Sequence, residues 1–147
     1  MGFGLVEIKN DSPEMIDFGL IKTSADEKLH IRLYKIHKDI QTIISHHSIS
    51  AISVEDVFYA KNIKSMMKLG HARGMALLCA AQQDIPLYEY SPRKVKQAVT
   101  GNGNASKEQV GYMVEKILNL SNIKIPSDAA DALAIALCHL QQFRYDD

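Results

Sequence analysis

Residues 128–136 read Asp-Ala-Ala-Asp-Ala-Leu-Ala-Ile-Ala, a run of small residues that carries two aspartates. The pattern predicts a helix from Asp128 to about Arg144, with Asp128 and Asp131 on one face because residues three apart on a helix are neighbours. The alanines are small enough to let this helix approach a sheet closely. The stretch therefore predicts a helix–sheet contact with two carboxylates beside it.

The rest of the chain alternates strand-like and helical segments. Asn10-Asp11-Ser12-Pro13 is typical of a hairpin turn, and Ser106 followed by Gln109 has the spacing of a capping box. No repeat, linker or low-complexity segment interrupts the chain, so we expect a single α/β domain over residues 1–147. The expected strands are 3–9, 15–21, 49–57 and 87–90, and the expected helices are about 26–46, 62–83, a short one from Pro92, 106–120 and 128–144.

Composition excludes several classes of protein. The longest apolar stretch, Gly74–Ala81, is far shorter than the roughly 20 residues that span a bilayer, and no export leader is recognisable. The two cysteines, Cys79 and Cys138, lie in apolar runs without the CxxC spacing, which is typical of a reducing compartment. We therefore expect a cytoplasmic globular protein with no membrane partner.

The net charge of zero conceals an uneven distribution. Residues 1–60 sum to −3, residues 61–116 to +5 and residues 117–147 to −2. A polyanion responds to the local field, so the basic middle segment permits a nucleic-acid partner. Lysines on ordinary surface helices would produce the same pattern, and the charge map leaves both interpretations open.

Three carboxylates form the first candidate site. Glu55 ends the predicted strand 49–57, where loss of hydration is costly without a partner. If the helix beginning at Asp128 lies against that sheet, Glu55, Asp128 and Asp131 can converge as hard oxygen ligands for Mg²⁺ or Mn²⁺. Alternatively, Asp128 is the N-cap of its helix, and both aspartates simply interact favourably with the helix dipole.

A group of lysines forms the second candidate site. Lys107 follows the cap Ser106 and the loop 101–104, Gly-Asn-Gly-Asn, so free backbone N–H groups and an ammonium are expected to point the same way. Lys94 and Lys96 lie on the short helix before the loop. The group can bind phosphate, or it can be a loop that happens to carry lysines; the pattern does not decide between them.

Three blocks of sequence resemble one known family. They are Val54-Glu-Asp-Val-Phe-Tyr-Ala-Lys-Asn62 with Leu69-Gly-His-Ala-Arg-Gly74, then Tyr90-Ser-Pro-Arg-Lys-Val-Lys-Gln-Ala-Val-Thr-Gly-Asn-Gly103, then residues 128–136. In this order and spacing they resemble the RuvC family of Holliday-junction resolvases over nearly the whole chain. The resemblance implies an RNase H-like fold, of the ribonuclease H superfamily, with a mixed sheet flanked by helices.

The resemblance also implies an activity and its partners. It describes a homodimeric endonuclease that resolves four-way DNA junctions by paired symmetric nicks with 5′-phosphate products. It implies Mg²⁺, or Mn²⁺, as cofactor, two ions per active site, and the RuvA–RuvB branch-migration complex as partner. The alternative is a catalytically inactive junction- or nucleic-acid-binding module of the same fold.

Residue by residue, the resemblance assigns catalytic, metal-binding roles to Glu55, Asp128 and Asp131. Phe58 corresponds to an aromatic residue that stacks on junction bases, a general way of holding unpaired DNA. Lys96 and Lys107 correspond to lysines that contact DNA near the scissile phosphate. The basic segment adds two further DNA-binding candidates, Arg73 and Lys94.

One part of the family pattern is missing from the printed sequence. The family begins with a strand ending in Asp-Pro-Gly, whose Asp is a metal ligand and whose strand lies between the first hairpin strand and the strand bearing Glu55. We expect that Met1 is an internal methionine of a chain longer by about a dozen or more residues. We also expect the 147-residue form to fold poorly and to cut junctions feebly or not at all.

Overall fold

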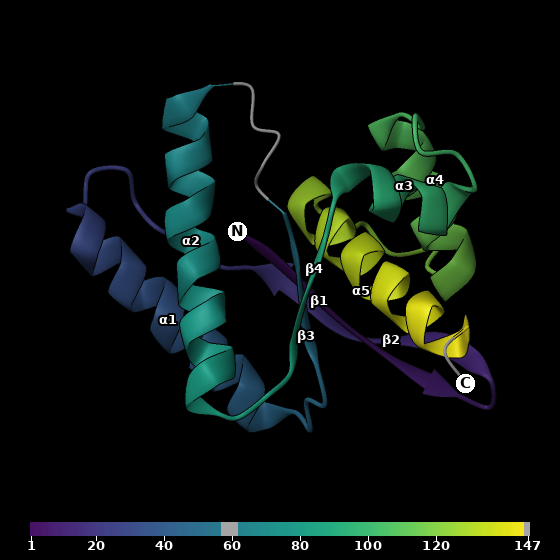
Figure 1. The fold of residues 1–147 in the computed structure, drawn as a ribbon, viewed down its shortest axis with the longest axis horizontal. Coiled ribbons are helices and arrows are strands. Elements are labelled where there is room, and N and C mark those ends of the chain that lie inside the picture. The colour runs from purple at the N-terminus through teal and green to yellow at the C-terminus, as the bar shows by residue number, and fades with distance from the viewer. Residues whose placement is uncertain (57–61, 146–147) are drawn as a thin grey trace. The chain divides into compact units, whose positions relative to one another are not determined.

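The structure is a computed structural model that describes residues 1–56 and 62–145, with side chains up to Phe143 (Figure 1). The described chain divides into two compact units, which are treated separately below. The hairpin unit comprises Met1–Leu20 and Tyr90–Asp147, and the two-helix unit comprises Ile21–Glu89. The single domain expected from the sequence stays a prediction.

The hairpin unit begins with two antiparallel strands joined by a tight turn. Strands β1 (Gly2–Lys9) and β2 (Ser12–Leu20) pair with Lys9 opposite Ser12, leaving two turn residues. Those residues, Asn10 and Asp11, have φ of 50° and 62°. Two successive left-handed residues give the turn that matches the twist of a hairpin, and Asn and Asp tolerate this conformation well. The predicted hairpin is confirmed.

Helix α5 (Ser127–Tyr145) packs against β1 through two glycines that lack the bulk to keep the helix away. A Cβ atom on Gly2 would lie 2.1 Å from the carbonyl oxygen of Asp128, and one on Gly4 would lie 2.7 Å from Leu133 Cγ. The alternation of a strand puts Gly2 and Gly4 on the same face. The close helix–sheet approach predicted from the alanines is confirmed, and glycines on the strand contribute to it as well.

Helices α3 (Pro92–Thr100) and α4 (Lys107–Leu118) complete this unit and pack on α5. Both begin as the sequence predicts. The Ser91 side chain accepts the N–H of Lys94, and Ser106 and Gln109 form both hydrogen bonds of the capping box. The buried side chains of the three helices are Val95, Val99, Val110, Val114, Leu118, Ala129, Leu133, Ala134, Leu137 and Cys138.

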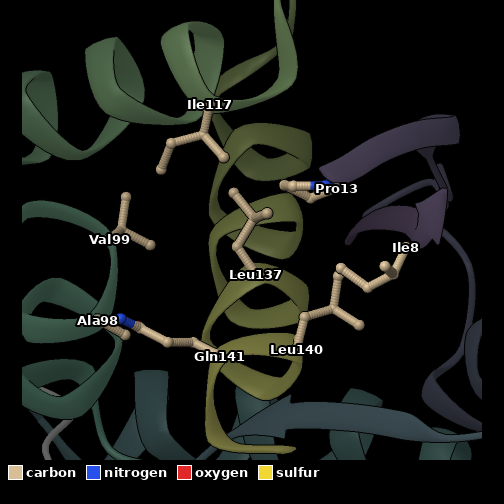
Figure 2. Close-up of a pocket in the computed structure, with 8 residues that line it drawn as sticks. All are labelled: Ile8, Pro13, Ala98, Val99, Ile117, Leu137, Leu140 and Gln141. Carbon is tan, nitrogen blue, oxygen red and sulfur yellow. The ribbon is translucent and has the colours of Figure 1, made fainter. Parts of the chain in front are cut away.

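An apolar cavity of about 180 Å³ remains inside the hairpin unit. Figure 2 shows Leu137 and Leu140 of α5 between the hairpin residues Ile8 and Pro13 on one side and Val99 of α3 on the other. The helix is therefore the central element of the unit, in contact with the hairpin and with both shorter helices. The full lining is Ile8, Pro13, Ala98, Val99, Ile117, Leu137, Leu140 and Gln141.

The two-helix unit contains α1 (Leu29–His46) and α2 (Ile63–Gln82), which lie side by side (Figure 1). Asn62 caps α2 by accepting the N–H of Ser65. Strands β3 (Ile52–Glu55) and β4 (Leu87–Tyr90) form the short sheet associated with it. Its buried apolar residues are Ile21, Ile36, Ile40, Ala76, Cys79 and Ala80.

The described strands form two sheets of two strands each, β1–β2 and β3–β4. No described strand hydrogen-bonds to both β1 and β3, which agrees with the absence from the printed sequence of the family strand that lies between them. The strand that contains Ile52 is also shorter than the predicted segment 49–57, of which Val57 lies outside the described residues. No described helix combines the length and apolar character of a transmembrane segment.

A half-buried imidazole connects Tyr90, at the end of β4, with the last turns of α5. His139 Nδ1 lies 2.7 Å from the hydroxyl oxygen of Tyr90, and its ring meets Phe143 edge-on at a centroid distance of 4.7 Å. Burial lowers the pKa of His139, because the charged ring would lose its hydration. The neutral ring is therefore the form that fits this position.

We predict that substituting Gly4 destabilises the protein because of its contact with α5. Gly4→Ala would place a methyl group 2.7 Å from Leu133 Cγ and Cδ2 and 3.0 Å from its backbone nitrogen, and should cost about 1–3 kcal/mol of unfolding free energy. Gly111→Ala is the control, because nothing lies within 4 Å of a Cβ there and the helix interior favours alanine by roughly 1 kcal/mol. Urea unfolding measures both, and equal stability of the two variants would contradict the close contact.

A second prediction concerns acid. The unfolded chain takes up a proton at His139 near pH 6.5, whereas the folded chain does so only at lower pH, since burial lowers that pKa. The stabilisation from this group is thus complete above about pH 6.5 and is lost as the pH falls through the folded pKa. His139→Gln should flatten this part of the pH dependence in urea unfolding, and Tyr90→Phe, which keeps the imidazole, should preserve it. Identical profiles for parent and His139→Gln would refute the assignment.

Candidate active site

Asp128 and Asp131 lie in the first turns of α5. The helix begins at Ser127, so Asp128 is its second residue and the interpretation as an N-cap is wrong. The carbonyl of Pro126 accepts the first helical hydrogen bond, from the N–H of Ala130. Both aspartates therefore project from regular helix, three residues apart, near the end of the helix where the dipole favours negative charge.

Lys107 forms an ion pair with one of the two aspartates, Asp131. Its Nζ lies 3.2 Å from Asp131 Oδ2, which connects the first residue of α4 to the second turn of α5. The side chains are 61% and 46% exposed, and an ion pair with that much contact with water contributes at most about 1 kcal/mol to stability. The pair therefore brings the N-terminal ends of two helices together without being an important source of stability.

The loop before Lys107 uses its own backbone donors internally. The sequence predicts free N–H groups beside the Lys107 ammonium, and they are not those of the loop, because each backbone N–H from residue 101 to residue 106 has a partner inside the chain. The acceptors, in that order, are Gln97 O, Thr100 Oγ1, Gln97 Oε1, Asn102 Oδ1, Asn102 O and Gln109 Oε1.

The donors that remain near the lysine belong to α4 itself. The backbone N–H groups of Lys107 and Glu108 precede the one that the cap satisfies, at Gln109. Such first-turn amides have no acceptor within their own helix. The free N–H groups expected beside the Lys107 ammonium are therefore those of the first turn of α4.

Lys94 and Lys96 both lie on α3, as predicted. The ammonium of Lys94 lies 5.4 Å from the centre of the Tyr90 ring, a cation–π distance. The carbonyl of Lys96 accepts the hydroxyl of Thr100, and its side chain is partly exposed. Their roles as DNA contacts stay predictions.

Glu55 and Arg73 lie together in the two-helix unit. Glu55 is the exposed last residue of β3, so the argument from burial of this carboxylate does not hold. The Arg73 Nε donates to the carbonyl oxygen of Glu55 at 3.3 Å, and an Arg73 terminal nitrogen lies 2.6 Å from Glu89 Oε1. Sequence reasoning missed Glu89 as the partner of Arg73, since residues sixteen apart on different elements leave no local signal.

The predicted stacking residue, Phe58, lies outside the described residues. Across residues 1–56 and 62–143, no three His, Cys, Asp or Glu side chains gather closely enough to hold a metal ion. Asp128 and Asp131 nonetheless fit a hard divalent cation in donor type and spacing, with two carboxylates one helical turn apart. This end of α5 therefore places carboxylate oxygens beside the Lys107 ammonium and the first turn of α4.

Comparison with known proteins identifies the family. The sequence profile described as "Crossover junction endodeoxyribonuclease RuvC" matches residues 1–139. The relative so named from Natranaerobius thermophilus is 44% identical, with 97% of this chain and 89% of that protein aligned, and the one from Protochlamydia amoebophila is 44% identical over 95% and 83%. The structure "T. thermophilus RuvC in complex with Holliday junction substrate" superposes with a TM-score of 0.91 at 36% identity, covering 99% of this chain and 88% of that one. The chain therefore belongs to the RuvC family of crossover junction endodeoxyribonucleases, with the RNase H-like fold that its motifs implied.

Proposed function

We propose that this protein resolves Holliday junctions by cutting a phosphodiester bond at the site formed around Asp128, Asp131 and Lys107. The observation that carries the proposal is the 3.2 Å pair between Lys107 and Asp131 at two converging helix N-termini. A similar structure carries "Holliday junction substrate" in its name, which supports junction DNA as the ligand. In the reaction, water loses a proton and attacks phosphorus, the bond to the 3′ oxygen breaks, and that oxygen takes up a proton, so that the products are a 5′-phosphate and a 3′-hydroxyl.

The cofactor we propose is Mg²⁺, with Mn²⁺ as a substitute and two ions per site. Asp128 and Asp131 would hold it, and the resemblance adds Glu55 as a third ligand. When bound, Mg²⁺ supplies Lewis acidity, which lowers the pKa of the attacking water and stabilises charge on the leaving oxygen. The proposal rests on the donor type of these side chains and on the family.

The protein's own groups manage the charge of the phosphate. The ammonium of Lys107 and the first-turn amides of α4 face the same neighbourhood as Asp131 and can hold non-bridging phosphate oxygens. Lys94 and Lys96 are proposed to contact the DNA backbone on either side, and Arg73 and Phe58 to contact the junction. Much of the cost of bringing DNA to acidic side chains is offset by this basic surrounding.

A homodimer is the proposed assembly, because two nicks require two sites. Helix α2 presents an exposed apolar stripe, which we define as Ile63, Met66, Met67, Gly70, Gly74 and Leu78. Gly70 and Gly74 have open space where a side chain would be, so another helix could approach closely there. The stripe does not include Ala76, Cys79 and Ala80, which are buried in the unit itself.

The cellular setting follows the family. We propose the RuvA–RuvB branch-migration complex as partner and the cytoplasm as compartment, both on the resemblance. The competing function, a catalytically inactive junction-binding module, is one outcome of the test below.

The test is nicking of a labelled four-way junction by the full-length gene product in Mg²⁺. Glu55→Gln and Asp128→Asn should each slow nicking by about 100-fold or more, because each removes a charged oxygen from the site. Junction binding without Mg²⁺, measured by gel mobility, should stay within about threefold, because the lysines remain. Glu115→Gln, on the exposed surface of α4, is the control and should behave as the parent.

Two results would count against this account. Nicking at the parent rate by both carboxylate variants would refute the site. A parent protein that binds junctions tightly but leaves every strand uncut in Mg²⁺ would favour the inactive binding module.

The dimer is tested by sedimentation of single-charge variants of α2. Met67→Glu puts a carboxylate in the exposed stripe and should shift the protein to monomer at micromolar concentration, because a buried unpaired charge is costly. Ser65→Glu adds the same charge on the opposite side of the helix and should leave the dimer intact. Equal sedimentation of the two variants would exclude the stripe as the interface.

A further inference from the structure

The side-chain amide of Gln97 holds the loop between α3 and α4 at two points. Its Nε2 donates to the carbonyl oxygen of Gly101 at 3.1 Å, and its Oε1 accepts the N–H of Gly103 at 3.0 Å. The backbone carbonyl of Gln97 also accepts the N–H of Gly101, at 2.9 Å, which ends the helix. Gln97 therefore fixes both the end of α3 and the backbone of the following loop at Gly101 and Gly103.

The two hydrogen bonds of the Gln97 side chain are called the clamp. The rest of the loop is held by Asn102 and by Arg93. Asn102 accepts the N–H of Asn104 through its side chain and the N–H of Ala105 through its carbonyl. Gly103 lies so close to Arg93 that a Cβ on the glycine would be 2.9 Å from the arginine Cγ. The loop is thus held on one side by hydrogen bonds and on the other by the stem of an arginine.

The clamp lies a short distance along the chain from the candidate active site. After Gly103 the chain runs through Ala105, which is 3% exposed, to the cap Ser106 and then to Lys107. Because every N–H from 101 to 106 is already paired, a displacement of the first half of the loop is passed on to the first turn of α4. That turn carries the ammonium that lies 3.2 Å from Asp131.

We propose that Gln97 is a positioning residue, which sets the place of the Lys107 ammonium and the first-turn amides of α4 through the loop; the proposal rests on the proposed function of Lys107. The Gln97 side chain is exposed and does not pack in the buried core. Its hydrogen bonds therefore hold the backbone of the loop in place. A catalytic group displaced by about 1 Å can lose up to about 100-fold in rate.

The experiment compares Gln97→Ala, Gln97→Glu and Lys107→Met in the full-length gene product. Gln97→Ala should slow junction nicking at saturation by roughly 10-fold to 100-fold, with junction affinity within about threefold and an unchanged urea midpoint. Gln97→Glu keeps an acceptor for Gly103 but cannot donate to Gly101, and should fall between alanine and the parent. Gln41→Ala, which removes a partly exposed helical glutamine that donates to Gln82, is the control and should nick at the parent rate.

A double variant separates positioning from a general structural effect. If Gln97 acts through Lys107, the combination of Gln97→Ala and Lys107→Met nicks no more slowly than Lys107→Met alone. If the two losses multiply, or if Gln97→Ala nicks at the parent rate, the proposal is overturned.

A readout independent of activity uses amide signals in NMR. In Gln97→Ala the N–H of Gly103 should exchange with solvent faster and the N–H of Lys107 should shift, whereas unchanged signals at both would overturn the proposal. A parent protein that does not nick would instead count against the proposed function, and the amide signals would still decide the role of Gln97.

Discussion

The hairpin unit depends on how closely a backbone can approach a helix. Gly2 and Gly4 leave the first half of β1 without side chains where it meets α5, and the positions where their Cβ atoms would be are taken by Asp128 and Leu133. This contact sets the distance between strand and helix, and with it the place of the first turn of α5. The position of the carboxylates in the first turns of α5 thus depends on the absence of Cβ atoms at Gly2 and Gly4.

The same unit gathers charge by means of helix ends. The pair between Lys107 and Asp131 brings the N-termini of α4 and α5 together, so two dipoles favour negative charge at one place. Aspartates there are stabilised, and a phosphate arriving beside them meets an ammonium and free first-turn amides. The zero net charge of the chain therefore says little about DNA, because what matters is the distribution of charge around this point.

Sequence was a good guide where the signal is local. Ser106 and Gln109 lie three residues apart, and the hydrogen bonds that their spacing predicts are both present. The turn at Asn10 and Asp11 was equally readable. For the candidate site, the small residues around Asp128 indicated a close helix, and the family motifs indicated the chemistry.

Other features escaped because their causes are distant in sequence or lie in three dimensions. Neither Arg73 nor Glu89 announces that the two will pair, and nothing in the loop sequence shows that Gln97 will occupy its donors. The separation of the strands into two sheets, in contrast, agrees with the missing family strand that the motifs place between them. The cost of dehydration expected for Glu55 is absent because Glu55 is the exposed last residue of its strand, and the exposure of a strand end depends on neighbours distant in sequence.

The hydrogen bonds of the loop from Gly101 to Ser106 also determine at which step its conformational entropy is lost. Since its backbone donors find acceptors within the chain, the conformational entropy of ordering this segment is lost once, when the protein folds. In the proposed function, a DNA strand at Lys107 would meet a loop that is already ordered. Less of the binding free energy between phosphate and protein is then offset by ordering the loop, so more of it can contribute to discrimination between DNA shapes.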